Sequence, residues 1–103
     1  MTRAALARHI DRQWPFEWDE EKRQANLVKH AVDFRRITEL FDGTTVEIVD
    51  GREDYGETRI TCLGEIEGRV YVVAYTWRGA NRRIISARKA NARERKTYYA
   101  RVE

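Results

Sequence analysis

Arginine residues recur in the second half of the chain where neighbouring strands could bring their side chains together. Arg59 lies in a run of alternating polar and apolar residues, and Arg83 and Arg88 lie in and just after another. Guanidinium groups pair with phosphate oxygens, and tyrosine rings stack on unpaired bases. If Arg59, a tyrosine and one or two later arginines share one face of a sheet, they form a shallow cationic cleft of the kind that binds RNA. The pattern leaves open which of Arg83 and Arg88 points into that cleft.

The charge of the chain is unevenly distributed. Its 103 residues include 20 Lys and Arg against 17 Asp and Glu, for a net charge of +3. Residues 82–103 hold eight of the basic residues and only two acidic ones, so the rest of the chain is acidic overall. Such a separation can guide a polyanion to one end of a small domain. A solvated amphipathic terminal helix would carry the same charge, and the two interpretations remain open.

The composition argues against several classes of site and protein. The single cysteine, Cys62, excludes an internal disulfide and a cysteine-rich zinc site, and it is expected to pack in the core. His9 and His30 lack metal-ligand spacing, and the common nucleotide-binding and zinc-protease motifs do not occur. No apolar run approaches the ~20 residues that span a membrane, and residues 1–7 lack a signal-peptide core. We therefore expect a soluble cytosolic protein with no cofactor and no metal.

The hydrophobic pattern predicts one α+β domain at residues 15–103, with an N-terminal appendage at 1–14. After a short edge strand at 16–18, Asp19 and Asp33 are expected to cap two helices, at 20–30 and 34–42. The period then changes to two, which predicts a four-strand antiparallel meander at 44–49, 57–63, 69–77 and 82–87. The expected connections are loops at 50–56, 64–68 and 78–81, and a terminal helix follows at 88–101. Helices followed by strands imply that the helices cover one face of the sheet and leave the other face open.

The two-residue period of a strand also assigns side chains to faces. In the second strand, Ile60 and Cys62 are expected on one side, and Arg59 and Thr61 on the other. The last strand is expected to place Arg82, Ile84, Ser86 and Arg88 on one side, and Arg83, Ile85 and Ala87 on the other.

Three motifs occur in order along this domain. They are FEWDEEKRQANLVKHAVDF at 16–34, DYGETR at 54–59 and RIISARKANARERKTY at 83–98. Together they resemble the BrnT family, the toxin half of a bacterial type II toxin–antitoxin pair. The resemblance runs from about Phe16 to Tyr99. Ala31 stands where the family usually has glycine, a departure that should affect only the turn.

The resemblance implies a RelE-like ribonuclease fold and a metal-independent endoribonuclease that cleaves mRNA and arrests growth. It also implies a BrnA-like antitoxin with a ribbon-helix-helix DNA-binding domain. That antitoxin would neutralise the toxin, and the complex would bind operator DNA. A homodimer and a heterotetramer with the antitoxin are both compatible with the sequence.

The requirements of metal-free RNA cleavage lead to a hypothesis for the role of each candidate residue. A base must take the proton of the 2′-hydroxyl, cations must stabilise the charged phosphorus centre, and an acid must protonate the leaving oxygen. The candidates are Glu57 as base, Arg59, Arg83 and Arg88 as phosphate clamp, and Lys89, Tyr75 or Tyr98 as acid. A tyrosinate or a lysine could replace Glu57. The side chains expected to contact RNA are Lys22, His30, Tyr75, Arg78 and Tyr98.

The same residues also have purely structural interpretations. Glu57 could pair with a neighbouring arginine, Arg83 could bridge to an acidic residue of a helix, and Arg88 and Lys89 could simply begin the terminal helix. A small basic α+β domain could also act as a non-catalytic module that binds nucleic acid or another protein. The sequence does not decide between this class and the enzyme.

Overall fold

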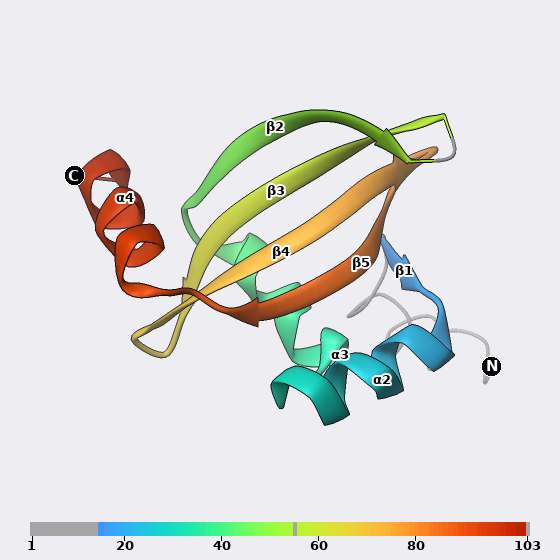
Figure 1. Ribbon diagram of the computed structural model, residues 1–103, viewed down its shortest axis with the longest axis horizontal. Coiled ribbons are helices and arrows are strands. Elements are labelled where there is room, and N and C mark those ends of the chain that lie inside the picture. The colour runs from blue at the N-terminus through green and yellow to red at the C-terminus, as the bar shows by residue number, and fades with distance from the viewer. Residues whose placement is uncertain (1–14, 55, 103) are drawn as a thin grey trace, which may run out of the picture.

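The elements of the chain follow the order that the sequence predicts. The computed structural model describes residues 15–54 and 56–102, so the predicted appendage at 1–14 lies outside the described residues. The elements are β1 (Phe16–Trp18), α2 (Glu20–His30), α3 (Phe34–Ile37), the 3-10 helix η1 (Thr38–Asp42), β2 (Thr45–Asp54), β3 (Glu57–Ile66), β4 (Arg69–Arg78), β5 (Asn81–Lys89) and α4 (Ala92–Val102) (Figure 1). The α+β class is confirmed. Within the described residues, no helix has the length and apolar character needed to cross a membrane.

The sheet is mixed and has five strands in the order β1-β5-β4-β3-β2. Strands β2 to β5 form the predicted antiparallel meander. The expectation of a purely antiparallel four-strand sheet is wrong, because β1 joins it as an edge strand parallel to β5. The register of this edge pair places Glu17 opposite Arg83. The N-terminal strand thus brings an acidic residue beside one of the candidate arginines.

Helix α2 begins at a residue that can cap it and is attached to the sheet by a buried amide. The Asp19 carboxylate accepts hydrogen bonds from the backbone N–H of Glu21 (2.8 Å) and of Lys22 (3.3 Å), as the sequence predicts. Asn26, which is buried, donates to the Ala87 carbonyl (2.8 Å) on β5 and accepts from the Ala87 N–H (3.2 Å). These bonds fix the position of α2 along β5.

The second predicted helix is divided into α3 and η1. Asp33 caps α3 as expected, by accepting from the N–H of Arg35 at 2.9 Å. The α-helical turn stops at Ile37, and a 3-10 helix continues to Asp42. The Thr38 hydroxyl donates to the Arg35 carbonyl at 2.9 Å, a local bond that competes with regular helix continuation. One continuous helix at 34–42 was therefore a wrong expectation.

The strands are longer and the connections shorter than the sequence suggested. Strand β2 continues through most of the predicted loop at 50–56, and β3 continues to Ile66. The β3–β4 hairpin therefore closes on Glu67 and Gly68, which both have positive φ (49° and 81°), as a primed two-residue turn requires.

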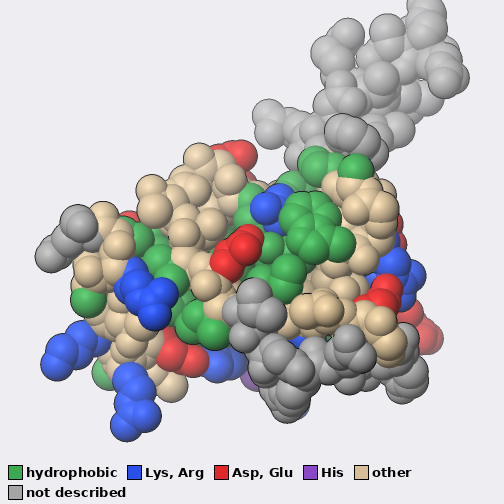
Figure 2. Space-filling view, turned by 90° about the horizontal axis from the view of Figure 1, so that it is seen from above, with side chains coloured by type: hydrophobic (Ala, Val, Ile, Leu, Met, Phe, Trp, Pro, Cys, Tyr) green, Lys and Arg blue, Asp and Glu red, His purple; other side chains and the backbone are tan. Residues whose placement is uncertain are grey.

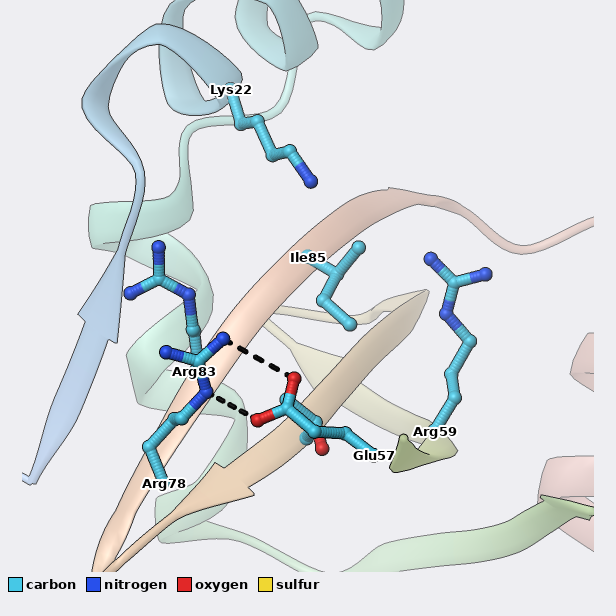
Figure 3. A pocket seen from close by; sticks show the side chains of 7 residues that line it. Lys22, Glu57, Arg59, Arg78, Arg83 and Ile85 are labelled. Carbon is cyan, nitrogen blue, oxygen red and sulfur yellow. Dashed lines mark hydrogen bonds and ion pairs between the residues drawn. The ribbon is translucent and has the colours of Figure 1, made fainter. Parts of the chain in front are cut away.

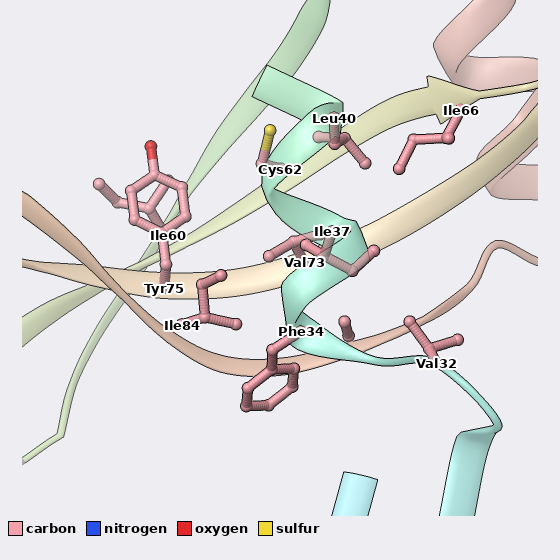
Figure 4. Close-up of a cluster of buried hydrophobic side chains, with 11 residues drawn as sticks. Val32, Phe34, Ile37, Leu40, Ile60, Cys62, Ile66, Val73, Tyr75 and Ile84 are labelled. Carbon is pink, nitrogen blue, oxygen red and sulfur yellow. The ribbon is translucent and has the colours of Figure 1, made fainter. Parts of the chain in front are cut away.

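The two faces of the sheet carry separate cores. The first face packs against α3 and η1 (Figure 4), and its buried side chains are Val32, Phe34, Ile37, Leu40, Ile60, Cys62, Ile66, Val73, Tyr75, Ile84 and Ala87. Cys62 lies in this core as expected, and burial raises the pKa of its thiol to about 11. The second face is covered at one end by α4, through Val46, Leu63, Val70, Val72, Ala90 and Tyr98. The expectation of one wholly open face is thus wrong. Among the residues whose side chains are described, the accessible part of this face lies at the end away from α4.

A β-bulge in β5 changes which side chains share a face. Tyr75 on β4 lies opposite Ile84, whereas Ala74 lies opposite Ser86, so Ile85 is the extra residue. Ala87 therefore joins Ile84 in the first core, instead of lying on the opposite side as strict alternation predicts.

Candidate functional site

A pocket opens at the accessible end of the second face, where three strands and the start of α2 meet. The side chains that line it are Lys22, Glu57, Arg59, Thr76, Arg78, Arg83 and Ile85 (Figure 3). The register places Arg83 on β5 opposite Thr76 on β4, while Arg59 comes from β3. The pocket thus gathers four cationic side chains around one carboxylate. Such a surface attracts anions and matches the chemistry of a phosphate group.

Glu57 and Arg78 form an ion pair within the pocket. The Arg78 Nη2 donates to Glu57 Oε1 at 3.2 Å, and the Arg78 Nε donates to Oε2. The hydrogen bond to Glu57 raises the pKa of the Arg78 guanidinium. The pairing of Glu57 with a neighbouring arginine, which the sequence left open, is therefore present. Arg78 fixes the orientation of the Glu57 carboxylate toward the pocket (Figure 3).

Arg83 is held by an acidic residue of the edge strand. Its Nη1 donates to Glu17 Oε2 at 2.8 Å, and Asn81 donates to Glu17 Oε1 at 3.1 Å. The bond from Asn81 and the neighbouring Arg83 lower the pKa of the Glu17 carboxyl. The predicted acidic partner of Arg83 lies on a strand and not on a helix. The sequence analysis missed Glu17 as part of the site, and only its parallel register with Arg83 could have revealed it.

Lys22 reaches the pocket from a different layer of the molecule. It lies in the first turn of α2, three residues after the Asp19 cap, and α2 is fixed to β5 through Asn26. Figure 3 shows its side chain directed from α2 toward the space between Ile85 and the arginines. Of the side chains expected to contact RNA, Lys22 and Arg78 line the pocket together with Arg59 and Arg83.

Arg88, Lys89 and His30 do not line this pocket. Arg88 forms two hydrogen bonds of 2.8 Å with the carboxylate of Glu94 on α4. Glu94 in turn accepts from the backbone N–H of Asn91, whose side chain accepts from the Glu94 N–H, so the two residues form a capping box. This box starts α4 at Ala92 rather than at the predicted residue 88. Arg88 thus supports the start of α4, and we remove it from the candidate phosphate clamp.

Two further candidates are buried rather than exposed. The Tyr75 ring lies in the first core, and its hydroxyl donates to Glu47 Oε2 at 2.5 Å. Burial and this bond raise the pKa of Tyr75 to about 12. Tyr98 lies on the buried side of α4, packed against the second sheet face, and donates to the Thr44 carbonyl at 2.8 Å. Neither ring can stack on a base or protonate RNA from these positions, so the expectation for both residues is corrected.

Across 15–54 and 56–102, no three His, Cys, Asp or Glu side chains lie close enough together to hold a metal ion.

The fold and the pocket agree with one class of protein, the ribonuclease toxins of type II toxin–antitoxin systems. Residues 18–94 match the family model described as the ribonuclease toxin BrnT of such systems. Because the match covers about three quarters of the chain and every residue that lines the pocket, the chain belongs to the BrnT family. A toxin of this kind acts on RNA and has an antitoxin protein as its partner. The comparison with curated proteins found no match.

Proposed function

We propose that this BrnT-family chain is a metal-independent endoribonuclease that cleaves mRNA in the cytoplasm at the pocket on the second sheet face. The observation that carries the proposal is the convergence of Lys22, Arg59, Arg78 and Arg83 around Glu57. These side chains come from four separate elements, α2, β3, β4 and β5, and meet at one place. Together they supply the positive charge that a reacting phosphodiester needs.

Substrate binding in this proposal rests on Arg59 and Arg83. A guanidinium group presents several N–H donors in a planar fork, and the bond from Arg83 to Glu17 uses only Nη1. The pair can therefore bind the non-bridging oxygens of one phosphate. Holding the phosphate between β3 and β5 also fixes the neighbouring ribose, which is a precondition for in-line attack.

The cleavage step that these residues support is an internal transesterification. The ribose 2′-oxygen attacks phosphorus while Glu57 takes the hydroxyl proton, and the bond to the 5′-oxygen breaks as Lys22 donates a proton to it. The products are a 2′,3′-cyclic phosphate and a free 5′-hydroxyl, and no water is consumed. Arg59 and Arg83 stabilise the additional negative charge on phosphorus in the transition state. Lys22 replaces Lys89, Tyr75 and Tyr98 as the candidate acid because it lines the pocket.

The same pocket suggests how a BrnA-like antitoxin would inhibit the toxin. A segment of the antitoxin rich in Asp and Glu would satisfy the four cationic side chains and exclude RNA. The ribbon-helix-helix domain of the antitoxin would then bring the inactive complex to operator DNA. The assembly in this proposal is a heterotetramer of two toxins and two antitoxins, because ribbon-helix-helix domains bind DNA as dimers.

The direct test uses the purified chain and a long mRNA in buffer with excess EDTA. We expect fragments that end in 2′,3′-cyclic phosphate. Intact RNA that migrates more slowly with the chain would instead identify a non-catalytic binding module. Cleavage that EDTA abolishes and Mg²⁺ restores would contradict metal independence but not the ribonuclease assignment.

A further inference from the structure

Trp77 is a large aromatic residue that the first core does not bury. It lies near the end of β4, and 45% of its surface is exposed. By contrast, Tyr75, which lies two residues earlier in the same strand, is fully buried. Exposed aromatic rings next to a cationic pocket are the usual means by which proteins bind single-stranded nucleic acid.

The Trp77 ring is held in place by its surroundings. The Arg82 guanidinium carbon lies 4.7 Å from the Trp77 ring centroid, and the Tyr75 ring meets it edge-on with centroids 5.8 Å apart. Arg82 is itself anchored over Phe41, at 4.3 Å from that ring. The ring is thus ordered before any ligand binds, which lowers the entropic cost of stacking.

A shallow hollow beside Trp77 borders the cationic pocket at the end of the sheet. The residues that line it are Gly56, Glu57, Thr58, Ile60, Thr76 and Trp77. Glu57 and Thr76 line the cationic pocket as well. The two hollows therefore meet at the end of the sheet where β3 begins and β4 ends. A nucleotide chain with a phosphate in the first hollow can pass round this end and place a base in the second.

We propose that Trp77 is a stacking platform for a base of the RNA substrate, adjacent to the phosphate held by Arg59 and Arg83. This inference rests on the proposed function, because it assumes that the cationic pocket holds a phosphate of RNA. The shared border with the cationic pocket favours RNA over a protein ligand. The Arg82 cation behind the ring draws electron density from the indole and strengthens its stacking on an electron-rich base.

The test measures binding of a fluorescein-labelled, 2′-O-methylated RNA of mixed sequence, which cannot be cleaved by transesterification. Trp77→Ala should weaken binding by roughly 5- to 100-fold, the range for the loss of one stacked base. Trp77→Phe should stay within about threefold of wild type, because a smaller ring still stacks. The matched control is Ile48→Ala, which removes a similarly exposed apolar side chain (43%) from β2 and should leave binding unchanged.

A second measurement keeps the test informative if Trp77→Ala fails to fold. In a variant with Trp14→Phe and Trp18→Phe, Trp77 is the only tryptophan, and the same RNA should quench its emission. Unchanged emission at saturating RNA, or equal RNA affinity of folded Trp77→Ala and wild type, would overturn the proposal. Weaker binding of the antitoxin with unchanged RNA affinity would also overturn it and would assign Trp77 to the protein interface. Cleavage of RNA by the wild type in EDTA, measured in parallel, tests the proposed ribonuclease function separately from the role of Trp77.

Discussion

At the scale of single residues, Arg83 links the edge strand with the candidate site. Glu17, which also accepts a hydrogen bond from Asn81, holds Arg83 on one side, and Arg59 shares the pocket with it on the other. The alternation of polar and apolar residues was enough to predict that Arg59 could face a cleft. It could not predict Glu17, because that contact depends on the parallel register of two strands more than 60 positions apart. For Tyr75 the prediction of contact with RNA was wrong, because the side chain is buried. Alternation alone cannot distinguish a buried tyrosine from an exposed one.

The Glu17 contacts predict a pH-dependent contribution to stability. Glu17→Gln should lower the free energy of unfolding at pH 7 by about 1 kcal/mol, because a partly buried, hydrogen-bonded ion pair is lost. The pKa of Glu17 is lowered from 4.5 in the folded chain, so its contribution is present above pH 4.5 and is lost as the pH falls through the folded-state value. Urea denaturation at pH 7 and at pH 3 measures the difference.

The control for this prediction is Glu39→Gln, which alters an exposed glutamate in η1. We expect it to change the free energy of unfolding by less than about 0.5 kcal/mol at either pH. A Glu17→Gln effect that stayed the same at pH 3, or that matched the control at pH 7, would show that the ion pair with Arg83 does not stabilise the fold.

At the scale of elements, local signals predicted where helices begin, and long-range contacts decided where strands pair and bend. Asp19 and Asp33 cap their helices as the sequence indicates. The bulge at Ile85 could not be predicted, because it results from fitting β5 against β4 while Ala87 also binds Asn26 of α2. This bulge places Ala87 in the core and so reverses the expected faces beyond Ile85. The arginines of the motif at 83–98 could therefore be assigned to faces only from the structure.

The end of α2 gives a second prediction. Ala31 has a left-handed backbone conformation (φ 59°, ψ 31°), and its N–H donates to the Leu27 carbonyl to close the helix. Because a side chain is strained in this region, Ala31→Gly should increase the free energy of unfolding by about 0.5–1 kcal/mol. Equilibrium urea denaturation at neutral pH measures this change.

The matched control for Ala31 is the same substitution inside the helix. Ala25→Gly changes an exposed position of α2 and should destabilise the chain by about 0.5–1 kcal/mol, because glycine is entropically unfavourable in a helix interior. If both variants lost stability to the same extent, the left-handed conformation of Ala31 would carry no strain, and the account of this turn would be wrong.

At the scale of the whole molecule, positive charge is concentrated in two places. One is the pocket, and the other is the end of the molecule that carries α4, where Lys and Arg side chains stand out from the surface (Figure 2). The sequence predicted the second region from its composition, although it could not place that region relative to Arg59. The pocket itself required the structure, because Lys22 comes from a helix and its partners from three strands.

The basic side chains of α4 lead to a prediction of how RNA binding depends on salt. Arg93 and Lys96 are exposed on α4 and lie outside the residues that line the pocket. If they contact RNA phosphates, the double variant Arg93→Ala/Lys96→Ala should reduce the slope of log K against log salt concentration by about 1.4, or about 0.7 per contact. Cleavage at saturating RNA should be unchanged. An unaltered slope in titrations between low and moderate salt would mean that α4 does not contact the RNA.

The central claim is that guanidinium groups from β3 and β5 act together on one phosphodiester. The most direct measurement is single-turnover cleavage of a defined RNA in EDTA by Arg59→Ala and Arg83→Ala, with Arg36→Ala as control because its exposed side chain pairs with Glu67 outside the pocket. We predict that each pocket variant loses roughly 10²–10³ in rate, by analogy with the removal of a transition-state contact, while the control cleaves like wild type. Folded pocket variants that cleave within about threefold of wild type would contradict the account.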